Sequence, residues 1–262
     1  MSELQNPSRA RMAAGKLAMG AAVRIGRTVE IVPAFRTAGL DWVFLDLEHG
    51  PISIDVASQI AVTALQAGLT PIARVPKGEY GMATRLLDNG AMGLVMPHVD
   101  TAEEAREMVE KLRFPPGGKR SVFGGMPQFG FAPRPVKETS EILNRETLVI
   151  AMVETPESVE NAFEIAAVPG IDVLFIGTND LCAEMGIPGQ FGRPEVAAAY
   201  DRVIEACRQH GKYSGMGGLY DPALMKKFTG AGIQFVLMGS DHSFMLQAAR
   251  QKVLELQPES KA

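Results

Sequence analysis

Residues 42–50 read Trp-Val-Phe-Leu-Asp-Leu-Glu-His-Gly, an almost unbroken apolar run that ends in acidic residues, a histidine and a glycine. An apolar run without alternation is typical of a strand covered on both faces, as in a parallel sheet. Similar short runs recur along the whole chain and predict eight strands: Leu17–Ala22, Trp42–Leu47, Ile72–Val75, Gly93–Met96, Leu148–Val153, Val173–Ile176, Tyr213–Met216 and Phe235–Met238.

Helical patterns lie between these runs. Thr101 followed by Glu104 predicts a capping box for a helix that ends near Leu112. Further helices are predicted at Pro156–Ala166, Pro194–His210 and Pro222–Thr229, the last capped by Asp221. Strand followed by helix, repeated eight times, is typical of an α/β fold of the (β/α)8 or TIM-barrel type. We therefore expect one barrel domain over residues 1–262.

A doubly wound open sheet is the alternative fold. It would normally carry a glycine-rich phosphate loop after its first strand. The first strand here ends Gly20-Ala21-Ala22-Val23-Arg24, without that pattern. One irregular stretch, at about 114–137, is rich in proline and glycine. Long loops in compact domains are often functional, so we predict an active-site lid or a subunit contact there, with a passive surface loop as the alternative.

Composition excludes several classes of protein. Of the 262 residues, 46% are hydrophobic and 21% charged, which is typical of a globular chain, and the net charge of −4 argues against nucleic-acid binding. The charge-poor stretch Val56–Ala73 is interrupted by polar residues, glycine and proline, unlike a membrane span. Leu17–Val23 faintly resembles a signal peptide but lacks a clear cleavage site. Two cysteines, Cys182 and Cys207, fit a reducing compartment, so we expect a cytoplasmic protein.

Polar side chains follow most of the predicted strands. In a barrel the carboxyl ends of the strands form one rim, and active sites lie there. The residues expected at this rim are Asp46, Glu48 and His49 after the second strand, Arg74 in the third, His98 after the fourth, Glu154 after the fifth, Gly177 to Asp180 after the sixth, and Ser240 and Asp241 after the eighth.

Glu154 and Asp180 are the candidate metal ligands. Two carboxylates from neighbouring strand ends offer the hard oxygen ligands that Mg²⁺ or Mn²⁺ prefers. The alternative is that each residue caps the helix that follows it.

Arg74 and His49 are the candidate groups for oxo-acid chemistry. The planar guanidinium of Arg74 matches a carboxylate or an enolate oxygen, although an internal ion pair with Asp46 or Glu48 would also explain it. His49 can act as an acid or base, with Asp46 orienting it, or it can be a structural histidine. The turn Gly177-Thr178-Asn179 can hold a carboxylate on its backbone N–H groups.

These motifs together resemble the HpcH/HpaI family of metal-dependent pyruvate aldolases. The resemblance runs in order from about residue 15 to residue 250. Its motifs are Phe44-Leu45-Asp46-Leu47-Glu48-His49-Gly50, Ala73-Arg74-Val75-Pro76, residues 87–103, Phe114-Pro115-Pro116-Gly117-Gly118-Lys119-Arg120, Met152-Val153-Glu154-Thr155 and residues 170–181.

The resemblance implies a class II aldolase that reversibly cleaves 4-hydroxy-2-oxo acids to pyruvate, or a close 2-oxo acid, and an aldehyde, as in aromatic or sugar-acid catabolism. By position, it implies that Glu154 and Asp180 hold a divalent ion such as Mg²⁺, Mn²⁺ or Co²⁺. It implies that Arg74 stabilises the enolate and that His49 with Asp46 forms an acid–base pair.

The resemblance also implies an assembly. Family members are usually hexamers built as trimers of dimers, in which the last helix packs on a neighbouring subunit. Asp88 matches an acid near that interface, and Gly177, Thr178 and Asn179 match the segment that holds the pyruvate carboxylate. The sequence departs from the family pattern in three places. Met152 stands where glutamine is frequent, Gly177-Thr178-Asn179 replaces Gly-Pro-Ala, and the loop after Arg120 differs. We expect Met152 to border the substrate and these departures to affect which aldehyde is used.

Three other functions compete with a metal-dependent aldolase. A decarboxylase of oxaloacetate-like acids would need the same enolate site. A Schiff-base aldolase would need a lysine at a carboxyl strand end, whereas Lys212 precedes the seventh predicted strand and Lys77 lies in a loop. A barrel that serves only for binding or assembly would have no need of the acidic pair and Arg74.

Overall fold

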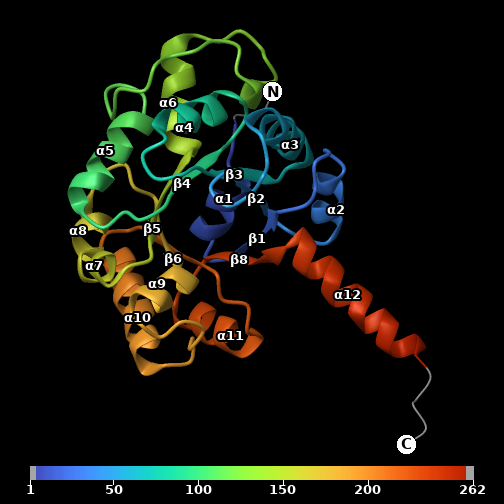
Figure 1. Cartoon of the computed structure of the whole chain (residues 1–262). Helices are drawn as coiled ribbons and strands as arrows, with labels where there is room; N and C mark the ends of the chain where they lie inside the picture. The colour runs from blue at the N-terminus through green and yellow to red at the C-terminus, as the bar shows by residue number, and fades with distance from the viewer. Residues whose placement is uncertain (1–3, 258–262) are drawn as a thin grey trace, which may run out of the picture.

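The computed structural model describes residues 4–257, in which eight parallel strands close into a barrel ringed by helices (Figure 1). The order around the barrel follows the sequence, and β8 pairs with β1. The strands are β1 (Ala18–Val23), β2 (Trp42–Asp46), β3 (Thr70–Arg74), β4 (Gly93–Met96), β5 (Leu148–Val153), β6 (Val173–Gly177), β7 (Tyr213–Gly217) and β8 (Phe235–Ser240). The predicted TIM barrel is confirmed, and the open sheet is excluded.

Helices precede, separate and follow the strands, and most of them lie around the outside of the barrel (Figure 1). They are α1 (Pro7–Ala13), α2 (Ile31–Thr37), α3 (Ile54–Ala67), α4 (Tyr80–Asp88), α5 (Ala102–Leu112), α6 (Val136–Glu146), α7 (Pro156–Glu160), α8 (Ala162–Ala167), α9 (Thr178–Glu184), α10 (Pro194–Gln209), α11 (Pro222–Ala231) and α12 (Asp241–Leu256), with a 3₁₀ turn η1 (Pro127–Phe129). The capping box of Thr101 with Glu104 and the Asp221 cap are both present. Within residues 4–257 no helix is apolar over a length that would cross a bilayer.

One predicted helix is divided in two. The segment Pro156–Ala166 forms α7 and α8, which meet at Asn161. The side chain of Arg202 on α10 donates to the carbonyl oxygens of Val159 (2.8 Å) and Glu160 (2.6 Å). These carbonyls end α7, so the arginine supplies the partner that a continuing helix would have supplied.

The barrel interior is filled by apolar side chains from most of the strands. Trp42 stacks on Phe235 with ring centroids 4.2 Å apart, and Phe175 meets Phe235 edge to face. Gly20 on β1 makes room for the indole, because a Cβ there would stand 2.1 Å from the Trp42 ring. The interior is therefore a packed core that supports the rim above it.

Helix α1 covers the amino ends of the strands. The Asn6 side chain donates to the carbonyl oxygens of Met92 (3.1 Å) and Glu146 (2.9 Å), and the Arg9 guanidinium pairs with Asp172 at 2.7 Å. Met12 is buried within the interior cluster of the barrel. The helix thus closes this end of the barrel with buried hydrogen bonds and an apolar side chain.

The predicted irregular stretch at 114–137 ends where α6 begins, at Val136. Arg120 in this loop lies over the Phe114 ring at 4.3 Å and pairs with Asp88 at 2.6 Å. Phe123 and Phe131 are exposed by 56% and 64%. In the part of the chain that the structure describes, this loop does not line the rim pocket, which weighs against a lid within one subunit.

The last helix, α12, projects away from the barrel instead of packing along it (Figure 1). Of its 16 residues only Asp241, at its first turn, is buried. Its exposed apolar side chains are Met245, Leu246, Val253, Leu254 and Leu256.

Candidate active site

A cavity of about 290 Å³ opens at the carboxyl ends of the strands. Eight of the ten predicted site residues line it: Asp46, His49, Arg74, Met152, Glu154, Gly177, Asn179 and Asp180. They come from β2, β3, β5 and β6 and from the segments directly after them. Parallel strands in a barrel deliver their last residues to one rim, which explains why positions far apart in the sequence meet here.

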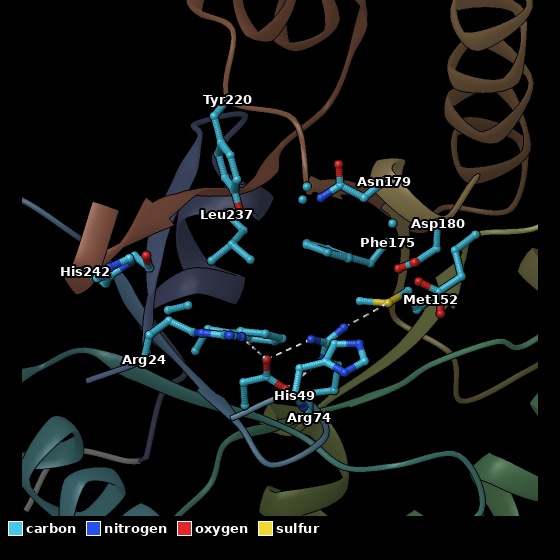
Figure 2. Close-up of a pocket in the computed structure, with 18 residues that line it drawn as sticks. Arg24, His49, Arg74, Met152, Phe175, Asn179, Asp180, Tyr220, Leu237 and His242 are labelled. Carbon is cyan, nitrogen blue, oxygen red and sulfur yellow. Dashed lines mark hydrogen bonds and ion pairs between the residues drawn. The ribbon is translucent and has the colours of Figure 1, made fainter. Parts of the chain in front are cut away.

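Arg74 and Asp46 form the central ion pair of the pocket. β2 and β3 pair in a register that puts these two residues side by side. The guanidinium donates through Nε to Oδ1 (3.0 Å) and through a second nitrogen to Oδ2 (2.8 Å). A third nitrogen lies 3.1 Å from Glu48. The predicted internal ion pair is present, and Arg74 still faces the cavity beside Met152 (Figure 2).

Neighbouring charged side chains determine the direction in which the pKa values of Arg74 and Asp46 shift. Burial would lower the pKa of Arg74, but the carboxylates of Asp46, Glu48 and Glu154 outweigh burial and raise it. Burial would likewise raise the pKa of Asp46, but the Arg74 hydrogen bonds and charge lower it. Both groups therefore stay charged at neutral pH, so Arg74 presents a permanent cation to the cavity.

Glu154 is buried as deeply as Asp46, with an exposed fraction of 1%. Its Oε1 accepts a hydrogen bond of 2.9 Å from the backbone N–H of His98, a residue held at φ +50°. The cap of α7 is Thr155, so Glu154 has no capping role; Gly177 precedes α9, and Asp180 lies in that helix's first turn. Burial, helped by the negative charge of Asp180, raises the pKa of Glu154 to about 7.

The raised pKa of Glu154 predicts a pH effect on the metal-free protein. The folded-state pKa of about 7 lies above the usual 4.5, so the cost of ionising the buried acid is absent below pH 4.5 and complete above pH 7. Relative to Glu154→Gln, the wild type should lose on the order of 3 kcal/mol of unfolding free energy between these limits. Urea unfolding of both proteins in EDTA across this pH range measures the loss. If the unfolding free energies of the two proteins changed with pH in the same way, the raised pKa of Glu154 would be contradicted.

His49 lines the pocket, but its contact with Asp46 differs from the predicted dyad. Asp46 Oδ1 accepts from the backbone N–H of His49 at 3.2 Å, while the imidazole Nε2 lies 3.7 Å from Glu48 Oε2. The side-chain partners of Asp46 are Arg74 and Arg24. Asp46 thus positions the turn that carries His49 and does not hold its ring; the catalytic role of His49 stays a prediction.

Two predicted residues lie outside the cavity. The Thr178 hydroxyl is buried against the Tyr200 hydroxyl (2.7 Å) and donates to the Gly217 carbonyl (2.8 Å), so only its backbone is available toward the site. Asp88 is bound to Arg120 at the end of α4.

Sequence reasoning missed three polar residues that line the cavity: Arg24, Tyr220 and His242. Figure 2 shows Arg24 and His242 on the side opposite Asp180 and Met152, with Tyr220 above them. Arg24 directly follows β1 and His242 follows β8, so the rule that identified the other rim residues could have found both.

The acidic pair fits a divalent cation. Glu154 and Asp180 provide carboxylate oxygens on one wall, and their mutual repulsion is relieved when a cation binds. Within residues 4–257 no cluster of three or more His, Cys, Asp or Glu side chains is gathered for a metal. Two carboxylates suffice for Mg²⁺-type ions, which keep several positions for water and substrate.

Gly177 provides the space for the Glu154 carboxylate. A Cβ at position 177 would stand 2.3 Å from Glu154 Oε2 and 3.0 Å from its Cβ. Gly177→Ala should therefore displace the carboxylate and weaken divalent-metal affinity at least ~10-fold while the barrel still folds. Metal titration followed by calorimetry tests this, with Gly81→Ala as the matched control because its added Cβ meets nothing within 4 Å. Unchanged affinity in Gly177→Ala would contradict the role of Glu154.

The fold and this pocket define a class: a (β/α)8-barrel enzyme with an acidic pair and a partly buried arginine around one cavity at the carboxyl rim. The family model described as HpcH/HpaI aldolase/citrate lyase matches residues 25–248. The chain belongs to that family, as its motifs predicted, and is a carbon–carbon lyase by class.

Similar proteins cover almost the whole chain. A 4-hydroxy-4-methyl-2-oxoglutarate aldolase of Hapsidospora irregularis is 37% identical over 92% of this chain and 91% of its own length. A hydroxypyruvate/pyruvate aldolase of Paraburkholderia phytofirmans is 32% identical over 98% and 99%. Among solved structures, an HpcH/HpaI aldolase from Desulfitobacterium hafniense superposes with a TM-score of 0.90 at 29% identity, covering 97% of this chain and 98% of that one.

Proposed function

We propose that this protein is a divalent-metal-dependent aldolase that cleaves 4-hydroxy-2-oxo acids to pyruvate, or a close 2-oxo acid, and a carbonyl product. The observation that supports this most is the meeting of Arg74, Glu154 and Asp180 in one cavity of about 290 Å³, which suits a small oxo acid. Relatives named as aldolases of this kind of substrate, including 4-hydroxy-4-methyl-2-oxoglutarate, add support.

Glu154 and Asp180 would hold Mg²⁺, Mn²⁺ or Co²⁺. The bound ion would supply Lewis-acid polarisation of the oxo acid. Arg74 donates N–H groups to the keto oxygen of the pyruvate unit and stabilises the negative charge that develops there. Because Asp46 fixes the guanidinium through two hydrogen bonds, Arg74 needs no reorientation during the reaction.

Proton transfer is assigned to His49. Its half-exposed imidazole lines the cavity and can take the proton of the C4 hydroxyl. The C3–C4 bond then breaks, its electron pair passes to the C2–C3 unit as an enolate, and a proton at C3 completes pyruvate. The N–H groups of the Gly177–Asn179 turn are assigned to the substrate carboxylate, and Met152 borders the cavity beside Arg74.

Pyruvate release from a panel of 4-hydroxy-2-oxo acids, with Mn²⁺, with Mg²⁺ and after EDTA treatment, tests the proposal. We expect activity that EDTA removes and the metal restores. Activity that persists in EDTA and is trapped by borohydride would indicate a Schiff base instead. Lys212 is poorly placed for one, because its Nζ donates to the carbonyl of Ile171 (2.9 Å), just before the amino end of β6.

We further propose a cytoplasmic homo-oligomer, a hexamer built as a trimer of dimers, in which α12 docks on a neighbouring subunit. The support is the projection of α12 and its exposed apolar side chains. The apolar loop around Phe123 and the Asp88–Arg120 pair are candidate contacts in the same assembly.

The oligomer proposal predicts that charges on α12 break the assembly. Leu246 and Val253 lie two helical turns apart and share a face. The double variant Leu246→Asp, Val253→Asp should sediment as smaller species, because burying two unpaired carboxylates is costly. Analytical ultracentrifugation measures this, with the exposed Gln251→Asp as the control. A monomeric wild type would contradict the proposal.

A further inference from the structure

The two walls of the cavity carry opposite charge. Glu154 and Asp180 line the cavity directly after β5 and at the start of α9, which follows β6. Figure 2 shows Arg24 and His242, which follow β1 and β8, on the side opposite Asp180. The apolar side chains of Phe44 and Leu237 also line the cavity. A substrate whose oxo-acid end lies at Arg74 and the acidic pair extends its other end toward the basic wall.

Arg24 is held in place by a buried carboxylate. Asp241, the first residue of α12, accepts hydrogen bonds from the backbone N–H groups of Arg24 (2.9 Å), Ile25 (3.1 Å) and Gly26 (2.7 Å). Asp241 is 9% exposed and directly precedes His242. One acid therefore fixes both the loop that carries Arg24 and the helix turn that carries His242.

The Arg24 guanidinium has N–H groups that remain available to a ligand in the cavity. Asp46 already gives both oxygens to Arg74, and Arg24 adds one contact of 3.2 Å to Oδ2. Within residues 4–257 this contact with Asp46 is the ion pair that Arg24 forms. The Arg24 side chain is 41% exposed. A planar guanidinium with free N–H groups on a cavity wall is suited to a carboxylate.

We propose that Arg24 and His242 form a subsite for a carboxylate on the C4 side of the substrate, so the preferred substrates are 4-hydroxy-2-oxo dicarboxylic acids. This rests on the proposed aldolase activity and names its substrate class. In the cleavage, the C3–C4 bond breaks and the C4 hydroxyl loses its proton. C4 becomes the carbonyl carbon of the second product, which is glyoxylate for 4-hydroxy-2-oxoglutarate, and C3 takes the electron pair and a proton to give pyruvate.

A matched substrate pair tests the subsite. 4-Hydroxy-2-oxoglutarate and 4-hydroxy-2-oxovalerate differ in a carboxylate against a methyl group on C4. We expect wild-type kcat/KM for the dicarboxylate to exceed that for the valerate at least ~10-fold. Arg24→Met should lower it ~10- to 100-fold for the dicarboxylate, mainly through KM, and less than ~3-fold for the valerate. His242→Ala should lose part of the same preference, and Arg24→Lys should recover part of it.

The control is Arg27→Met, which removes a cation from the same loop; Arg27 is exposed, binds backbone carbonyls and does not line the cavity. Its substrate preference should equal that of the wild type. A wild type that cleaves both acids equally, or an Arg24→Met variant that loses both activities equally, overturns the subsite and leaves the aldolase proposal standing. A wild type that cleaves neither acid with Mn²⁺ or Mg²⁺ overturns both. Circular dichroism of each variant shows that it is folded.

Discussion

Replacing Arg74 with alanine is expected to lower kcat for pyruvate release about 10³-fold, with only a modest change in metal affinity. In the proposed mechanism the guanidinium contact to the keto oxygen strengthens as negative charge develops there, so removing it should raise the free energy of the transition state. Steady-state kinetics with saturating Mn²⁺ measures kcat, and metal titration measures affinity separately.

The same substitution removes the main partner of a buried carboxylate. Asp46 would keep Arg24 at 3.2 Å and two backbone N–H groups, so we expect a stability loss of about 3 kcal/mol in addition to the kinetic effect. Arg74→Lys keeps the charge but not the two-pronged hydrogen bonds and should recover only part of kcat. Arg208→Ala, which removes an exposed arginine that does not line the cavity, is the control for folding. A kcat for Arg74→Ala within 10-fold of the wild type would rule out the proposed role.

Glu154→Gln and Asp180→Asn are expected to remove metal-dependent activity, at least ~10³-fold in kcat/KM, together with metal binding. Each amide keeps the shape of the acid but removes the charge that attracts the cation. Divalent ions raise the unfolding temperature of a protein that binds them in the folded state. This rise should be seen in the wild type and be absent from both variants.

A helix neighbour provides the control for the acidic pair. Glu184 lies on α9 with Asp180 but is exposed and outside the cavity, so Glu184→Gln should keep both activity and the thermal shift. The variants also separate metal binding from folding, because Glu154→Gln removes a buried charge and should leave the metal-free protein as stable as the wild type or more so. Full activity in either variant would contradict the metal assignment.

The strands could be predicted from the sequence because strands buried on both faces must be apolar throughout. The predicted and observed ends of β4 and β5 agree, and the others differ by at most two residues. The rim residues followed from the same rule, since each one directly succeeds an apolar run. The division at Asn161 could not be predicted, because it depends on an arginine 41 residues further along the chain.

Side-chain direction and distant partners account for most of what the sequence did not reveal. Proximity in sequence suggested that Asp46 serves the His49 ring, whereas strand register places Asp46 beside Arg74. The Arg24 loop is held by Asp241, 217 residues away. The direction of the Thr178 hydroxyl depends on where Tyr200 of α10 lies. Such facts come from the closure of the barrel and have no local sequence pattern.

The packed apolar core beneath the cavity, together with α1 at the amino end of the barrel, decides by which route reactants enter and leave. With that end closed, both cleavage products must leave through the same mouth, where Arg24 stands 41% exposed above the 1%-exposed Glu154. The fragment cut from the C4 side is nearer the mouth and departs first, and pyruvate follows. Run backwards, the enzyme should load pyruvate before its acceptor, an ordered sequence that product-inhibition kinetics would reveal.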